Sequence, residues 1–208
     1  MTGLRRGQKL DRDRRIVEAA ARLFRESGYE GVKIETIAEQ AGVSVGTIYN
    51  YYESKGDVLV AVVSLEVNEV IAAGESVLAA PPADASDAVC ALFGLYLRHS
   101  LHYLSKEMWR AAMSMSTLHP QSPLGRHYSG LDEGLCRQVC RLLAKLRAQG
   151  SIGAGVDVEL AGRILFNTMN MMFIGFVKDE DMGMEAVTGA VDTQTRMMMS
   201  LLAAAPIR

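Results

Sequence analysis

Hydrophobic positions recur with helical spacing along almost the whole chain, and no stretch alternates with the two-residue period of a strand. Proline and glycine interrupt the pattern near residues 81–82, 120–123, 150–155 and 179–183. Between these points we predict helices over 58–80, 86–104 with Ser86 as cap, 106–115, 124–146 and 184–203. The pattern therefore predicts an all-α chain.

Residues Ile34 to Tyr52, IETIAEQAGVSVGTIYNYY, have the pattern of two short helices packed against each other across a tight turn. The small residue Ala38 lets the helices cross closely. Gly42 is expected to take positive φ in the turn, which glycine does without steric cost. Ser44 is placed to cap the second helix, and Ile48 faces inward.

The second helix would then expose a glycine, several hydroxyls and an amide on a short surface. A free domain gains little from such a surface, whereas a helix in a DNA groove needs groups that reach phosphates and base edges. The pattern therefore predicts a helix-turn-helix that binds DNA.

The segment AGVSVGTIYNYYESK is similar to the recognition segment of the TetR family of transcriptional regulators, and the resemblance runs from about Arg14 to Val62. Upstream, IVEAAARLFRESGYEG looks like the first helix of that family. The resemblance implies an amino-terminal three-helix DNA-binding domain over residues 1–53. Residues 54–208 would form a helical ligand-binding and dimerisation bundle, giving about nine helices in all.

Site residues follow from the resemblance. It implies that Ser44, Val45, Gly46 and Asn50 approach bases, and that Thr47, Tyr49, Tyr51 and Lys55 hold the DNA backbone. For Tyr52, packing between the short helices is an equal alternative. Ser54 and Asp57 have capping-box spacing at the start of the next helix.

Two positions depart from the family pattern. Lys33 stands where a capping Ser or Thr is usual, which puts that cap in doubt but could add a phosphate contact. Gly56 replaces an acidic residue and is expected to loosen the helix that follows.

Charge is unevenly distributed although the net charge is only −2. Through Arg15 the chain has six basic residues against two acidic ones, whereas after residue 60 it has twelve basic and fifteen acidic. Positive charge thus gathers at the amino terminus, which favours attraction to phosphates. Residues 1–9 are predicted to be a basic arm that is disordered alone and still touches the duplex.

The three cysteines form no disulfide framework, and no apolar signal segment opens the chain, which favours a reducing cytoplasm. Cys136 and Cys140 share a helix face and are interpreted as small core residues, with redox sensing as the alternative.

The segment Ile164 to Val177, ILFNTMNMMFIGFV, is apolar on nearly every side. It falls short of the roughly 20 residues that span a bilayer. A helix with its own core on one side and a second subunit on the other explains the pattern, so we predict a homodimer and no membrane segment.

Nine residues of the long carboxy-terminal region could converge on an apolar cavity with a few polar groups, the usual composition of a small-molecule site. Plain core packing is the competing interpretation. These candidates are Phe93, Tyr96, His99, Tyr103, Trp109, Met113, Tyr128, Asn167 and Met171.

No catalytic motif, cofactor motif or metal site is predicted. His99 and His102 are three apart on an expected helix, with Glu107 near in sequence, but no ligand cluster completes the set.

The favoured hypothesis is a homodimeric regulator that binds double-stranded operator DNA, with a small apolar effector that releases it. A ligand-independent DNA organiser or protein-partner adaptor is the alternative, and an enzyme built on the bundle is a more distant one.

Overall fold

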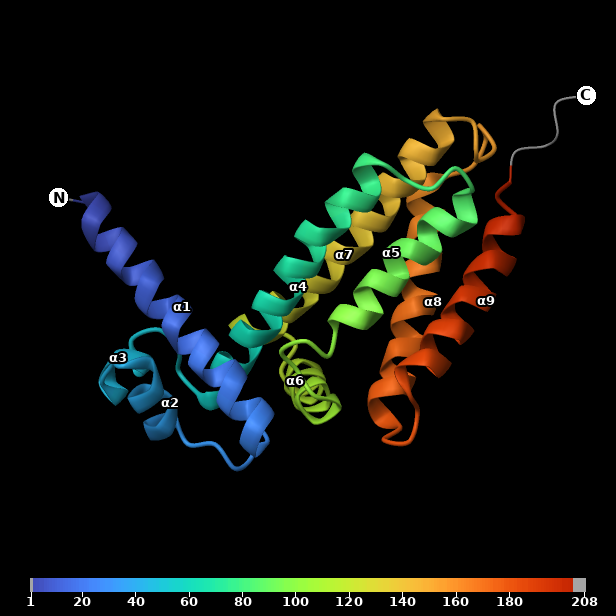
Figure 1. Cartoon of the computed structure of the whole chain (residues 1–208). Coiled ribbons are helices and arrows are strands. Elements are labelled where there is room, and N and C mark those ends of the chain that lie inside the picture. Colours follow the sequence, from blue (N-terminus) through green and yellow to red (C-terminus); the bar gives the residue numbers. More distant parts are fainter. Residues whose placement is uncertain (1, 204–208) are drawn as a thin grey trace, which may run out of the picture. The chain divides into compact units, whose positions relative to one another are not determined.

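The computed structural model describes residues 2–203, with side chains described from residue 7. Within that range it has no strand, and a lone bridge pairs Ile152 with Ala203. The all-α prediction is confirmed (Figure 1). The helices in this range are α1 (Thr2–Ser27), α2 (Ile34–Ala41), α3 (Val45–Tyr49), α4 (Lys55–Ala79), α5 (Ala85–His99), α6 (Lys106–Leu118), α7 (Pro123–Ala148), α8 (Val158–Lys178) and α9 (Met184–Ser200).

The helices form two compact units. The head unit joins the residues up to Glu66 with Leu101–Ser129, and the tail unit joins Val67–Ser100 with the residues from Gly130 onward. The head unit also includes α6 and the beginnings of α4 and α7. The predicted domain boundary after residue 53 stays a prediction.

The head unit is built around one face of α1. Ile16, Ala20 and Phe24 recur at four-residue steps on that face and are fully or almost fully buried. They share the core with Ile37 of α2 and Ile48 of α3, neither of which is exposed.

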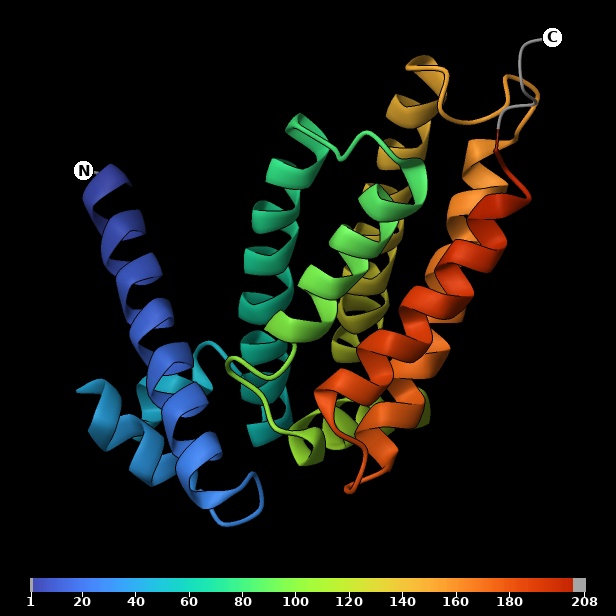
Figure 2. The ribbon, with the colours of Figure 1, turned by 45° about the vertical axis from the view of Figure 1, so that its right-hand side comes forward.

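The tail unit is a bundle in which α9 packs along α5 and beside α8 (Figure 2). A Cβ added at Gly162 of α8 would lie 2.6 Å from Cys140 Sγ and 3.0 Å from Cys140 Cα. Cys140 belongs to α7, so α7 and α8 approach so closely at this point that only glycine fits.

Two helix ends differ from the predictions. α1 starts at Thr2, so the expected disordered arm is helical where it is described. α5 ends at His99, five residues early, where the Ser100 hydroxyl donates to the Leu97 carbonyl. Its cap is Asp84 and not Ser86, because the Asp84 side chain accepts from the Asp87 amide at 2.9 Å.

α8 is longer than the apolar run that predicted it, with 21 residues from Val158 to Lys178. Among the described residues it is the one helix that could cross a membrane by length and composition. A core helix of a soluble protein has the same properties, and 44% of its most apolar window is buried within the chain. The inward side chains include Leu165, Phe166 and Val177.

Candidate DNA-binding interface and effector region

The turn between α2 and α3 has the predicted geometry. Gly42 has φ 63° and ψ 40°, the left-handed conformation that a Cβ disfavours. The next amide, that of Val43, donates to the Ala38 carbonyl at 3.0 Å, so the end of α2 is closed as in a Schellman motif. The prediction for Gly42 is confirmed.

Ser44 caps α3, also as predicted. Its Oγ accepts from the Thr47 amide at 3.1 Å and lies 2.8 Å from Thr47 Oγ1. At α2, in contrast, Lys33 is the N-cap residue and its side chain makes no capping bond. As this departure from the family pattern suggested, α2 has no side-chain cap.

Much of the surface of α3 is free of contacts within the chain. Tyr49 is 54% exposed. Ser44, Gly46, Asn50 and the more distant Lys33 are exposed, and Val45 and Thr47 are half-buried. The groups predicted to approach DNA thus remain accessible, while Ile48 alone anchors the helix to the core.

The two tyrosines after α3 bind α1. Tyr51 donates to the Lys9 carbonyl at 3.1 Å and is half-buried, so its predicted phosphate contact stays a prediction with a competing partner. Tyr52 donates to Asp13 Oδ1 at 2.5 Å, and burial followed by this bond raises the pKa of Tyr52 well above its ordinary value. For Tyr52 the packing alternative describes the geometry.

Lys55 is held by its own chain. Its Nζ donates to the carbonyls of Tyr29, Glu30 and Val32 at 2.9, 3.2 and 3.3 Å, in the loop between α1 and α2. The ammonium also lies 4.4 Å from the centre of the Tyr29 ring. An ammonium has three donors, and all three are used here. The phosphate contact predicted for Lys55 is untested.

The start of α4 explains the second departure from the family pattern. Ser54 and Asp57 form the predicted reciprocal capping box, with the Ser54 amide 2.8 Å from Asp57 Oδ2 and the Asp57 amide 3.2 Å from Ser54 Oγ. Gly56 is buried, and a Cβ there would lie 2.7 Å from Met115 Sδ of α6. Glycine therefore leaves room for α6 to pack on this turn.

A family model now accounts for this segment. Residues 16–62 match the model described as "Bacterial regulatory proteins, tetR family". This amino-terminal segment is therefore that of a TetR family transcriptional regulator.

Similarity to one relative extends far beyond the DNA-binding segment. The regulator is 27% identical to the "Fatty acid metabolism regulator protein" of Bacillus subtilis over 166 residues, which cover 78% of this chain and 82% of that one.

Two solved structures have the same fold. One is FadR of Bacillus subtilis in complex with stearoyl-CoA, with a TM-score of 0.63, 24% identity and coverage of 87% and 96% of the two chains. The other is the TetR family repressor FadR of Thermus thermophilus in complex with lauroyl-CoA, with a TM-score of 0.67, 22% identity and coverage of 94% and 98%. Regulators of the TetR family bind operator DNA and small-molecule effectors and act as dimers.

The nine residues predicted to line an effector cavity divide between the two units. Of those in the tail unit, Phe93 and Tyr96 are buried with ring centres 6.3 Å apart, and His99 Nε2 lies 3.9 Å from Glu69 Oε2. Asn167 and Met171 are exposed on α8, so they face away from the interior of a single chain.

The other four predicted residues belong to the head unit. Trp109 and Tyr128 are buried there, and Tyr103 and Met113 are half-buried. The Tyr103 amide donates at 2.9 Å to Glu66 Oε2, and the Glu66 side chain is almost fully buried. The convergence of the head-unit and tail-unit candidates on one cavity stays a prediction.

Gln138 is a buried polar residue of the tail unit that the sequence reasoning missed. Its Oε1 accepts from the Tyr96 hydroxyl at 2.7 Å, and its Nε2 donates to the Ile71 carbonyl and Glu75 Oε1, both at 2.8 Å. Only 1% of Gln138 is exposed, which makes it a candidate polar group toward an effector. Its position on the apolar stripe of α7, three residues after Leu135, was the available signal.

The expected pairing of His99 and His102 on one helix is wrong, because α5 ends at His99. Among the described residues, no three metal-ligating side chains come together.

We predict that the three cysteines react slowly in the folded regulator. Cys90, Cys136 and Cys140 are buried free thiols. Burial raises the pKa of Cys90 to about 11 and of Cys140 to about 12, so the reactive thiolate is scarce at pH 8 and increases only as the pH approaches these values. Reaction of Cys90 and Cys140 with Ellman's reagent at pH 8 should be at least about 100-fold slower than that of a free thiol. Rapid native reaction would contradict the core interpretation and revive redox sensing.

Proposed function

We propose that this regulator is a homodimeric repressor that leaves its operator when it binds a fatty acyl-CoA. The observation that carries the proposal is the similarity to the fatty acid metabolism regulator, because it covers 78% of the chain and so includes most of the tail unit. Similarity confined to the helix-turn-helix would support DNA binding alone. The two FadR structures with bound stearoyl-CoA and lauroyl-CoA support the same effector class.

The exposed residues of α3 would read the operator. We assign Ser44, Val45, Gly46 and Asn50 to base edges, as the resemblance implies. Lys33, Thr47 and Tyr49 would contact phosphates and set the position of the helix. Tyr51 and Lys55 belong to the same surface, and their bonds to α1 and to the loop before α2 fix its shape.

The dimer would form through an apolar surface of α8 and α9. Leu160, Ile164 and Met171 of α8 are 58%, 47% and 65% exposed, and Met197 of α9 is 71% exposed. We call these four residues the α8–α9 apolar face. Covering it with a second copy would remove this surface from water and fix two heads at the separation of operator half-sites, roughly 34 Å or a multiple.

Effector action then follows from linkage. A ligand shifts an equilibrium only by the difference of its affinities for the two states, so the acyl-CoA must bind the DNA-incompetent state more tightly. The acyl chain would enter the apolar interior to which Phe93 and Tyr96 belong, where Gln138 supplies a polar group. The regulator would act in the cytoplasm and without catalytic activity.

The test is a titration on an operator fragment isolated from bound genomic DNA. Lauroyl-CoA and stearoyl-CoA are expected to weaken operator binding about tenfold or more. Free coenzyme A and the free fatty acids, measured in parallel, should have little effect. If lauroyl-CoA and stearoyl-CoA both leave operator binding unchanged, the acyl-CoA assignment is lost and a ligand-independent organiser is supported. If no genomic fragment is enriched, DNA reading itself fails.

A further inference from the structure

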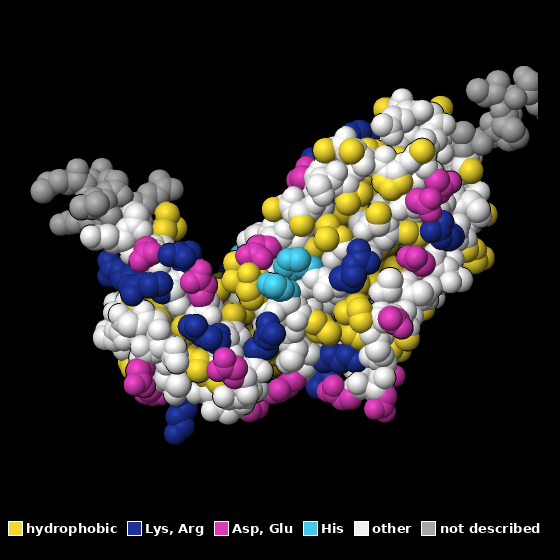
Figure 3. Space-filling view, in the orientation of Figure 1, with side chains coloured by type: hydrophobic (Ala, Val, Ile, Leu, Met, Phe, Trp, Pro, Cys, Tyr) yellow, Lys and Arg dark blue, Asp and Glu magenta, His cyan; other side chains and the backbone are white. Residues whose placement is uncertain are grey.

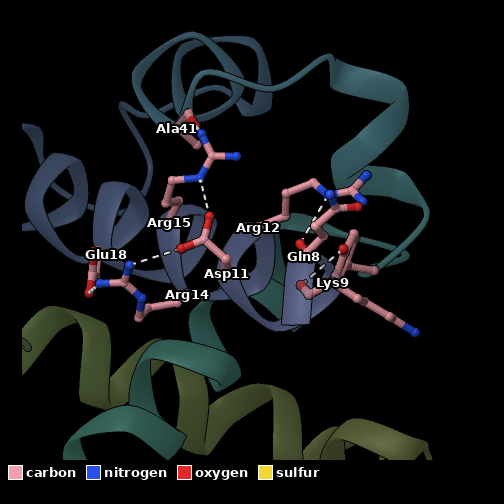
Figure 4. Close-up of polar contacts among 9 residues, drawn as sticks. Gln8, Lys9, Asp11, Arg12, Arg14, Arg15, Glu18 and Ala41 are labelled. Atoms are coloured by element: carbon pink, nitrogen blue, oxygen red, sulfur yellow. Dashed lines mark hydrogen bonds and ion pairs between the residues drawn. The ribbon is translucent and has the colours of Figure 1, made fainter. Parts of the chain in front are cut away.

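The basic residues of α1 lie on different sides of the helix. Arg14 forms ion pairs with Asp11 at 3.0 Å and with Glu18 at 3.2 Å. Arg15 pairs with Asp11 at 3.3 Å and donates to the Ala41 carbonyl at 3.1 Å (Figure 4). The charges of both arginines are therefore balanced within the head unit.

Lys9 and Arg12 have no such balance. They are three residues apart on α1, so they share a side of the helix, away from Arg14 and Glu18 (Figure 4). Arg12 donates through Nε to the Gln8 carbonyl at 3.1 Å, and Lys9 Nζ lies 5.6 Å from the centre of the Tyr51 ring. Among the side chains described from residue 7 onward, neither cation forms an ion pair with a carboxylate.

This side of α1 is attached to the end of the recognition segment. The Tyr51 hydroxyl binds the Lys9 carbonyl, and the Tyr52 hydroxyl binds Asp13. Both tyrosines follow within three residues of Tyr49, the exposed aromatic residue at the end of α3. The bonds of Tyr51 and Tyr52 to α1 thus hold the segment that carries Lys9 and Arg12 beside α3.

Figure 3 shows Lys and Arg side chains, in dark blue, interspersed with Asp and Glu side chains on the part of the surface that includes α1. The side chains of Arg5 and Arg6, which also contribute to the basic sequence, lie outside the described residues. Lys9 and Arg12 are the basic side chains described on this side of α1 before Arg14.

We propose that Lys9 and Arg12 form a second DNA contact, in which they bind duplex phosphates next to the base pairs read by α3. This contact rests on the proposed function and adds to it a rigid element in place of the mobile arm expected from the sequence. Because α1 is already helical and fixed by Tyr51 and Tyr52, little ordering entropy is lost when the two cations meet the phosphates. The contact carries no base preference, so it strengthens binding to any duplex.

The test compares a double variant, Lys9→Gln with Arg12→Gln, with the matched control Arg14→Gln. All three positions lie within two turns of α1, and glutamine has nearly the helix propensity of lysine and arginine. Affinity for an operator duplex and for an unrelated duplex is measured by fluorescence anisotropy over a range of salt concentrations. Each lost phosphate contact lowers the slope of log K against log salt by about 0.9.

We expect the double variant to lose a slope of about 1.8 on both duplexes and Arg14→Gln to lose almost none. Thermal unfolding of each variant, followed by circular dichroism, shows whether the head remains folded. Equal slopes for wild type and double variant would overturn the second contact, and so would equal losses in the double variant and in Arg14→Gln. If wild type itself binds no operator, the proposed function fails first, so the two failures are distinguishable.

Discussion

Replacing Ile164 and Met171 together by glutamate is expected to convert the dimer into folded monomers. The two residues are seven apart on α8, so they lie two turns apart on the same face, and they are 47% and 65% exposed in the single chain. Association would bury four unpaired carboxylates per dimer, at a cost of several kcal/mol for each charge that stays unpaired. We expect the dimer dissociation constant, measured by sedimentation equilibrium, to rise by about 100-fold or more.

Leu118→Glu is the matched control for this experiment. Leu118 is 70% exposed, but it lies at the end of α6 and outside the α8–α9 apolar face. This variant should remain dimeric and bind operator as wild type does. The double glutamate variant should lose operator affinity because its heads are no longer held at half-site spacing. A dimer that persists in the double variant would show that a surface other than the α8–α9 apolar face forms the dimer interface.

The parts of the head that were predicted correctly are local in sequence. The turn at Gly42, the cap at Ser44 and the capping box of Ser54 with Asp57 each involve residues at most five positions apart. Their hydrogen bonds are decided by residue type and spacing, which the sequence displays directly. Exposure of Tyr49 followed in the same way from helical spacing around Ile48.

Contacts between distant residues were not predictable in this way. Lys55 binds carbonyls more than twenty positions earlier, and Gly56 makes room for Met115 of α6. Periodicity gives the face of a helix but not the partner that covers it. Gln138 was missed for the same reason, because its hydrogen-bond partners lie on α4 and α5, far away in the sequence.

In the proposed effector region, the sequence did not reveal which side chains face the interior of the chain. Spacing alone grouped Phe93, Tyr96 and Asn167 as cavity residues. The structure buries the two aromatic residues and exposes Asn167 on α8. A helix that is apolar all round does not reveal which of its sides faces its own core and which faces a second subunit.

Two lysines of the head should respond to the same substitution in opposite ways. Lys55→Gln is expected to lower the free energy of unfolding by about 2 kcal/mol, because it removes charge-assisted bonds from an ammonium that is only 24% exposed. Chemical denaturation measures this change. The salt slope of operator binding should stay at the wild-type value, since the Lys55 donors are directed at carbonyls of the α1–α2 loop.

Lys33→Gln is the counterpart. Lys33 is exposed at the start of α2 and its side chain makes no capping bond, so the folded head loses little when its charge is removed. If Lys33 meets a phosphate, the salt slope falls by about 0.9 while the free energy of unfolding is unchanged. A Lys55→Gln variant that kept its stability and lost slope would reverse the assignment. Lys55 would then have exchanged its loop carbonyls for a phosphate on DNA, and the loop before α2 would be a part of the head that rearranges when the operator binds.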